Sequence, residues 1–153
     1  MDDSMRLWVD ADAVPAAVKE IIIRAALRRQ VSASFVSDKY VPLPTSALLA
    51  YISVECGPDS ADRYIIEAVE AGDLAITQDI PLAATLVAKG VVTIDPRGTL
   101  HTAGTVGERL SVRNFMTDLR GAGVITGGPA PFSQRDRQRF ADCLDRELTR
   151  RLK

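Results

Sequence analysis

The chain has 153 residues, of which 46% are hydrophobic and 25% charged, and its net charge is -1. This composition is typical of one folded globular domain and excludes a wholly disordered chain. No run reaches the roughly 18 uninterrupted apolar residues of a membrane span, and the start carries Asp2 and Asp3 where a secretory signal has basic residues, so we expect a cytoplasmic protein without membrane contact.

The charge is divided unevenly along the sequence. Residues 1–96 contain 8 Lys/Arg and 14 Asp/Glu, a net charge of -6, whereas residues 97–153 contain 11 and 6, a net charge of +5. Such a division is typical of a protein that contacts a cation with one part and a polyanion with the other. Ordinary solvated helix faces explain it equally well.

The first half of the chain begins with a short apolar strand, Arg6 to Val9, that ends in an acidic turn. Apolar residues at helical spacing run from Val14 to Ala26, with Pro15 in the first helical turn. A second strand is predicted at Ala33 to Val36, and a loop with two prolines follows it. The apolar stretch Ala47 to Cys56 fits either a strand or a helix.

The next segments continue the alternation of strands and helices. A helical pattern begins at Ala61 and stops at Gly72, and Leu74 to Thr77 reads as a strand. A helix over Ile80 to Lys89 and a strand over Val91 to Ile94 complete the series. Alternation of this kind predicts an α/β fold with a mostly parallel sheet flanked by helices, and we expect the first strand to lie beside Leu74 to Thr77.

The pattern changes after Pro96. Residues 97–107 are rich in turn formers, 108–119 are helical in pattern and 121–131 form a loop rich in Gly and Pro. The last segment, Ser133 to Lys153, is an Arg-rich helix that opens with Ser133 and Asp136 at capping-box spacing. No second core is evident, so we expect a single domain over residues 1–153 with a basic helical extension from about residue 97.

Four acids lie near the carboxyl ends of the predicted parallel strands, where sheets of this kind bind their ligands. Asp10 and Asp12 follow the first strand, Asp79 follows the strand at Leu74 to Thr77, and Asp62 lies near the start of the helix before that strand. If they converge at one sheet edge, their mutual repulsion is relieved by a hard cation such as Mg²⁺ or Mn²⁺. Asp12, Asp62 and Asp79 are also suited to cap helices, and that alternative stays open.

Several motifs in a fixed order carry a resemblance to a known family. They span nearly the whole chain and strongly resemble the YaiI/YqxD family of bacterial proteins. The motifs are WVDADAVP at residues 8–15 with KEI at 19–21, GDLAITQDIPLA at 72–83, PRG at 96–98, GGP at 127–129 and SQRDRQ at 133–138.

That family is in turn similar to the PIN-like nucleases, which use Mg²⁺ or Mn²⁺ to cut single-stranded RNA or other nucleic acid. The resemblance implies a three-layer PIN-like domain with Asp10, Asp62 and Asp79 as metal ligands in a catalytic group that includes Asp12. In this pattern Asp12 is a further ligand or orients the metal's water. The acid that the pattern places on an intervening helix has no clear counterpart, and Glu55 and Asp12 are the candidates.

The same resemblance implies that RNA is the partner and that basic residues hold its phosphates. The candidates are Lys19, Arg97, Arg113, Arg135 and Arg137. A first alternative is a nucleic-acid or protein binding module that does not cut. A second is a phosphatase of the haloacid-dehalogenase type, with Asp10 as nucleophile and Asp12 as general acid and base.

Overall fold

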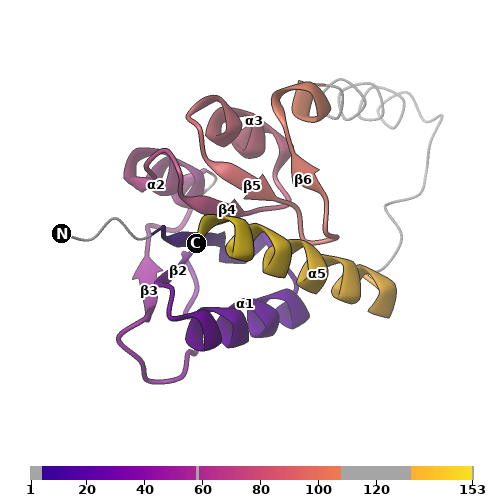
Figure 1. The fold of residues 1–153 in the computed structure, drawn as a ribbon. Helices are drawn as coiled ribbons and strands as arrows, with labels where there is room; N and C mark the ends of the chain where they lie inside the picture. The colour runs from indigo at the N-terminus through magenta and orange to yellow at the C-terminus, as the bar shows by residue number, and fades with distance from the viewer. Residues whose placement is uncertain (1–4, 58, 108–131, 153) are drawn as a thin grey trace.

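A six-stranded sheet forms the centre of the fold in the computed structural model, which describes residues 5–57, 59–107 and 132–152 (Figure 1). In chain order the strands are β1 (Leu7–Asp10), β2 (Ala33–Ser37), β3 (Leu49–Ser53), β4 (Leu74–Ile76), β5 (Val92–Ile94) and β6 (Leu100–His101). They lie in the order β3-β2-β1-β4-β5-β6. All neighbouring pairs are parallel except β5 and β6.

Helices cover both faces of this sheet. They are α1 (Ala16–Arg29), α2 (Ser60–Ala68), α3 (Ile80–Ala88) and α5 (Gln134–Arg151), with a 3-10 turn η1 (Ala11–Ala13) after β1. Residues 103–107 are also helical. Because α1 and α5 pack on one face and α2 and α3 on the other, the predicted three-layer α/β fold is confirmed (Figure 1).

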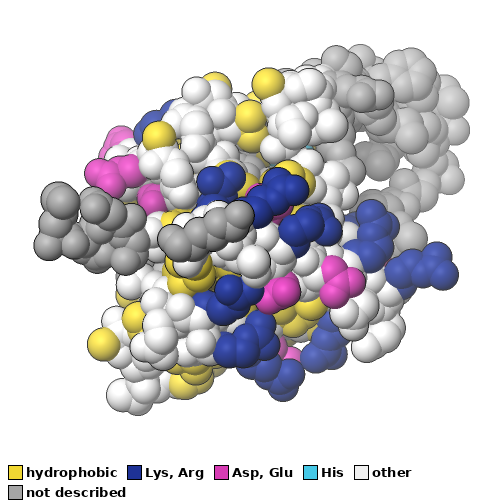
Figure 2. Space-filling view, in the orientation of Figure 1, with side chains coloured by type: hydrophobic (Ala, Val, Ile, Leu, Met, Phe, Trp, Pro, Cys, Tyr) yellow, Lys and Arg dark blue, Asp and Glu magenta, His cyan; other side chains and the backbone are white. Residues whose placement is uncertain are grey.

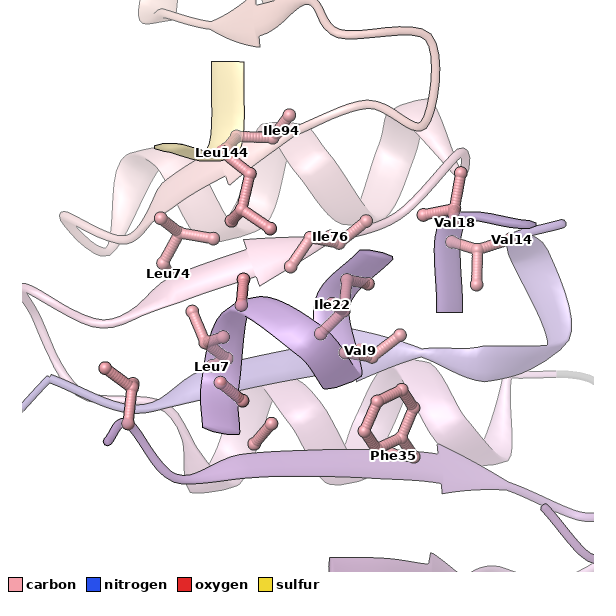
Figure 3. Packing of buried hydrophobic residues seen from close by; sticks show 14 of the residues in the cluster. Leu7, Val9, Val14, Val18, Ile22, Phe35, Leu74, Ile76, Ile94 and Leu144 are labelled. Carbon is pink, nitrogen blue, oxygen red and sulfur yellow. The ribbon is translucent and has the colours of Figure 1, made fainter. Parts of the chain in front are cut away.

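Alternating side chains of the central strands build two cores. Leu7 and Val9 of β1 face α1, where they meet Ile22 (Figure 3). Trp8 points to the opposite face and packs with Ile65 of α2. Each fully buried aliphatic side chain stabilises the fold by about 1.5–3 kcal/mol, so β1 is held firmly between both layers. By the same alternation Asp10, the last residue of β1, lies on the α2 side of the sheet.

The predicted neighbours are confirmed, since β1 pairs in parallel with β4 and Leu7 lies opposite Leu74. The undecided stretch Ala47 to Cys56 contains the edge strand β3, whose residues are all half-buried or exposed. An edge strand of this kind lacks a clear apolar face, which is why its pattern was ambiguous.

Three boundaries differ from the prediction. Helix α2 ends at Ala68 rather than near Gly72, because the backbone of Val69 is already extended. Pro15 precedes α1 instead of lying within its first turn. The strand β6 was not predicted, since it has only two residues inside a turn-rich segment and pairs with β5 alone.

The capping box at the start of α5 is confirmed. The Ser133 hydroxyl oxygen accepts the Asp136 N–H at 3.1 Å, and Asp136 Oδ2 accepts the Ser133 N–H at 2.9 Å. The predicted helix at 108–119 and the loop at 121–131 lie outside the described residues. In the part of the chain that the structure describes, no helix is both long and apolar enough to cross a bilayer.

Candidate functional site

A pocket of about 230 Å³ opens at the carboxyl ends of β1, β2 and β4, and aspartates dominate its lining. The structure brings together all four acids that the sequence indicated and adds two more. The six aspartates are Asp10, Asp12, Asp38, Asp59, Asp62 and Asp79. We call this the acidic pocket.

Asp10 forms the floor of the acidic pocket, where only 3% of its surface is exposed. The Thr77 hydroxyl, at the end of β4, donates to Asp10 Oδ2 at 2.8 Å and fixes the carboxylate. The pKa of Asp10 is raised from 3.8 to about 6, mainly by burial and in smaller part by the charges of Asp79 and Asp12, while the hydrogen bond from Thr77 lowers it. A buried carboxylate with like charges around it favours either a proton or a cation.

Asp79 serves two roles at the start of α3. Its Oδ1 accepts the Leu82 N–H at 3.0 Å, so it is the helix cap that the sequence allowed. Its own N–H donates to the Thr77 hydroxyl at 3.0 Å, which links it to the residue that holds Asp10. The capping bond therefore fixes Asp79 at the pocket wall instead of removing it from the site.

Asp62 enters the acidic pocket from the first turn of α2, and it is not the capping residue of that helix. Its pKa is raised from 3.8 to about 7. Burial is the largest cause, followed by the charge of Asp79, the charge of Asp10, hydrogen bonding to Asp79 and the charge of Asp59. The charges of Asp79 and Asp10 therefore disfavour a negative charge on Asp62.

Asp12 lies at the rim of the acidic pocket and is exposed. The Ser37 hydroxyl donates to its Oδ1 at 2.6 Å, and the Asp38 N–H donates to its Oδ2 at 3.5 Å. These bonds tie η1 to the end of β2. They also show that Asp12 does not cap a helix.

Two lining residues, Asp38 and Asp59, were not identified from the sequence. Asp38 directly follows β2, so the rule that selected Asp10 and Asp79 applies to it as well. Asp59 lies in the turn before α2 and has a positive φ of 67°. The sequence pattern around it gave no signal of function. Glu55, considered as the intervening acid, is exposed and is not among the described residues that line the pocket.

A second cavity, of about 490 Å³, adjoins the acidic pocket and shares Asp12 and Asp79 with it. Val14 and Pro15 line its other side, so this cavity opens toward the start of α1. No Lys or Arg appears among the described residues that line either cavity. A phosphate that entered the acidic pocket would therefore meet six carboxylates and no cationic side chain among the described lining residues.

The donor set suits a hard divalent cation, because it consists of carboxylate oxygens at a site where their charges repel. Within residues 5–57, 59–107 and 132–152, however, no three His, Cys, Asp or Glu side chains are already arranged to hold a metal ion. Asp12 is turned toward Ser37, and Asp79 toward the start of α3. Binding a cation there requires these side chains to close on it.

The basic residues singled out by the sequence lie outside the acidic pocket. Lys19 is one turn into α1, beyond the second cavity, and Arg135 and Arg137 stand in the first turn of α5. Arg97 forms an ion pair with Asp136 at 2.8 Å and therefore helps to attach α5. Arg113 falls outside the described residues.

Comparison with known proteins identifies relatives along almost the entire chain. A family model described as "Uncharacterized BCR, YaiI/YqxD family" matches residues 8–150. A UPF0178 protein of Syntrophobacter fumaroxidans is 56% identical over 149 residues, covering 97% of each chain. A UPF0178 protein of Myxococcus xanthus is 55% identical over the same share, and one of Shewanella amazonensis is 50% identical over 146 residues, covering 95% of this chain and 98% of its own. No solved structure matches this chain.

Proposed function

We propose that this chain, which belongs to the YaiI/YqxD family, is a metal-dependent nuclease that cleaves single-stranded RNA or another nucleic acid at the acidic pocket. The observation that carries the proposal is the convergence of Asp10, Asp62 and Asp79 from three separate elements on one pocket. Helix capping accounts for Asp79 but not for Asp10 and Asp62, which accept no capping hydrogen bond.

The side chains of the pocket have distinct tasks in this proposal. Asp10, Asp62 and Asp79 hold Mg²⁺ or Mn²⁺, and Asp12 orients a water at the rim. A divalent cation bound there supplies polarisation of a phosphate oxygen and a lowered pKa for the attacking water. Thr77 keeps Asp10 in place through its hydroxyl, and the Leu82 N–H does the same for Asp79.

Phosphate binding falls to basic residues beyond the pocket rim, because its described lining contains no cation. Lys19 is suited to this task because it lies one helical turn after Pro15, which lines the second cavity, and Arg135 and Arg137 because they lie at the start of α5. Each would hold a phosphate by a charge-assisted hydrogen bond.

A binding module that does not cut is the second candidate. It is favoured by the absence, among the described residues, of three acids already arranged around a metal position. The phosphatase alternative has less support, because no Lys lines the described pocket beside Asp10 and Asp12, as the phosphatase pattern requires. The nuclease and the binding module are therefore the two candidate functions of this chain.

A cleavage assay separates these two candidates. A labelled single-stranded RNA is incubated with the parent chain in Mn²⁺ and in EDTA, beside Asp10→Asn, Asp79→Asn and the control Glu67→Gln. Glu67 is an exposed acid of α2 outside the pocket lining. We expect cleavage by the parent and the control in Mn²⁺ only, and a loss of roughly 100-fold or more in both Asp variants. Binding of the RNA without any cleavage by the parent would exclude the nuclease.

A further inference from the structure

Arginines gather on the face of the molecule formed by α1 and α5. Figure 2 shows Lys and Arg side chains along both helices, with only a few acids between them. Helix α1 contains 4 Lys/Arg and one acid, and α5 contains 6 Arg and 4 acids, of which Asp136 and Glu147 are buried. The two helices together contain 10 Lys/Arg and 5 acids, a net charge of +5, and Glu147 offsets part of the charge of Arg146 at 3.9 Å and of Arg150 at 3.5 Å. We call this surface the arginine face.

A groove runs between the two helices on this face. It has a volume of about 180 Å³, and its floor is apolar, with Ala25 from α1 and Leu144 from α5. Arg24 and Arg28 line it, and both are exposed. Asp145 is the one acid among the described residues that line the groove. It is shared between Arg28 at 3.6 Å and Arg29 at 3.0 Å, so it offsets only part of their charge.

The arginine face is connected to the acidic pocket through α1. The second cavity, which shares Asp12 and Asp79 with the acidic pocket, ends at Val14 and Pro15, immediately before this helix. From Pro15 the rise of the helix brings Arg24 about 14 Å and Arg28 about 20 Å farther along, with Lys19 between. A flexible polyanion that follows this path passes around the carboxyl edge of the sheet, because the groove lies on the α1 side and Asp10 on the α2 side.

We propose that the arginine face binds the phosphate backbone of a single-stranded nucleic acid and guides it to the acidic pocket. This proposal rests on the proposed function, since it names the surface that holds the nuclease's substrate. Exposed guanidinium groups on rigid helices match successive phosphates, and they supply the attraction that the acidic pocket lacks.

The same surface is poorly suited to a membrane or to a protein partner. Stable attachment to a membrane or a protein combines charge with large exposed apolar side chains as anchors. Among the described residues the large exposed hydrophobics are Tyr40 and Tyr64, which lie in the loop after β2 and on α2. Neither belongs to the arginine face, so charge is the main feature by which it can recognise a partner.

The test is a binding titration with single-stranded RNA in EDTA, where no metal-dependent cleavage takes place. The double variant Arg24→Glu, Arg28→Glu is compared with Arg63→Glu, Lys89→Glu, which makes the same charge change at α2 and after α3. We expect the first variant to lose at least about 10-fold in affinity for an RNA of about 12 nucleotides, and the control to lose much less. The slope of log K against log salt should fall by about 0.7 for each lost phosphate contact.

The stability of the variants gives a second readout. Because Arg24 and Arg28 are exposed, urea unfolding should show nearly the same stability for the double variant as for the parent, whereas a folding defect would lower it together with the RNA affinity. Arg24→Ala, Arg28→Ala, which is milder, should show about half the change in log affinity. Equal losses of RNA affinity in the double variant and the control would overturn the proposal. Binding to phosphatidylserine vesicles is measured as well, and a double variant that keeps its RNA affinity but no longer binds the vesicles would also overturn it. If the double variant lost RNA binding but the parent did not cleave RNA, the proposed nuclease activity would be refuted and the RNA-binding arginine face would stand.

Discussion

At the residue scale, Asp10 and Asp73 are both buried aspartates of the central strands, and their partners give them different roles. Asp73 precedes β4 at the amino edge of the sheet and accepts three hydrogen bonds, from Arg6 N–H at 3.2 Å, Trp8 Nε1–H at 3.0 Å and Glu70 N–H at 3.0 Å. Asp10 accepts one side-chain bond, from Thr77, and lies among like charges. Asp73 is therefore satisfied within the fold, whereas Asp10 is left in need of a positive partner.

Replacing Asp73 by Asn should destabilise the fold without affecting the acidic pocket. An amide keeps one acceptor oxygen and presents an NH₂ group to the remaining donors, so at least one buried N–H loses its partner. We expect the free energy of unfolding to fall by about 1–3 kcal/mol in urea titrations. The response to Mn²⁺ should be unchanged. An Asp73→Asn protein as stable as the parent would show that these three bonds contribute little.

The raised pKa of Asp62 predicts how stability depends on pH in the metal-free protein. The pKa rises from 3.8 to about 7 on folding, so the folded state binds the proton more tightly than the unfolded chain does. Its contribution to stability is complete below about pH 4 and is lost as the pH rises through 7. The parent in EDTA should therefore be less stable at pH 8 than at pH 5.

Asp62→Asn should remove part of this slope, and at pH 8 it should be more stable than the parent by roughly 1 kcal/mol, because solvent screens the half-exposed carboxylate. Urea unfolding at both pH values measures the effect, with Glu67→Gln as the control. A stability difference between pH 5 and pH 8 that is the same in the parent and in Asp62→Asn would contradict the assigned repulsion.

At the element scale, α5 depends on a turn far away in the sequence. The turn at 95–99 follows β5, and its Arg97 forms an ion pair with Asp136 of the capping box. Gly98 has a φ of +91° and lies so close to α5 that an added Cβ would come within 2.6 Å of the Arg139 backbone. The PRG motif at 96–98 thus attaches the last helix to the sheet.

Gly98→Ala tests this attachment, with Gly72→Ala as its matched control. Both glycines have a positive φ, but an added Cβ at Gly72 meets nothing within 4 Å. The control should lose about 1–2 kcal/mol of stability from backbone strain alone. Gly98→Ala should lose clearly more, because backbone atoms cannot move aside easily. Equal losses in thermal unfolding would mean that α5 adjusts without cost.

Periodicity was sufficient to predict the buried elements, and it failed where an element is exposed or short. β1 and β4 are apolar and buried, so both their existence and their pairing followed from the sequence. β3 is half-exposed, and β6 has two residues that depend on β5 for their structure. The role of Arg97 was equally hidden, because its partner Asp136 lies 39 residues away.

The site was predictable to the extent that strand ends define it. Asp10 ends β1 and Asp79 lies three residues past β4, and the rule that selects them extends to Asp38, which directly follows β2. Asp59 could not be found, because only the packing of α2 brings it to the pocket. Asp73 also lies beside a strand, but it does not belong to the site. The three hydrogen bonds that it accepts within the fold account for it completely.

At the scale of the whole molecule, opposite charges are collected on different surfaces. Six aspartates line the acidic pocket at one edge of the sheet, and the arginine face covers the layer formed by α1 and α5. The uneven charge of the two halves of the sequence is thus only part of the pattern, since α1 belongs to the acidic half and contributes Arg24 and Arg28. A cation in the pocket and a polyanion on the arginine face would each find complementary charge.

The central claim is that the acidic pocket binds a divalent cation, and calorimetry of thermal unfolding tests it most directly. Ligand binding to the folded state should raise the Tm of the parent with Mn²⁺ concentration, by about 1.4 kcal/mol of stability for each tenfold excess over Kd. Asp79→Asn should be as stable as the parent or more stable without metal, because Asn caps α3 almost as well and repulsion is relieved. It should also lose most of the gain in Mn²⁺. A parent whose Tm does not respond to Mn²⁺ would contradict the account.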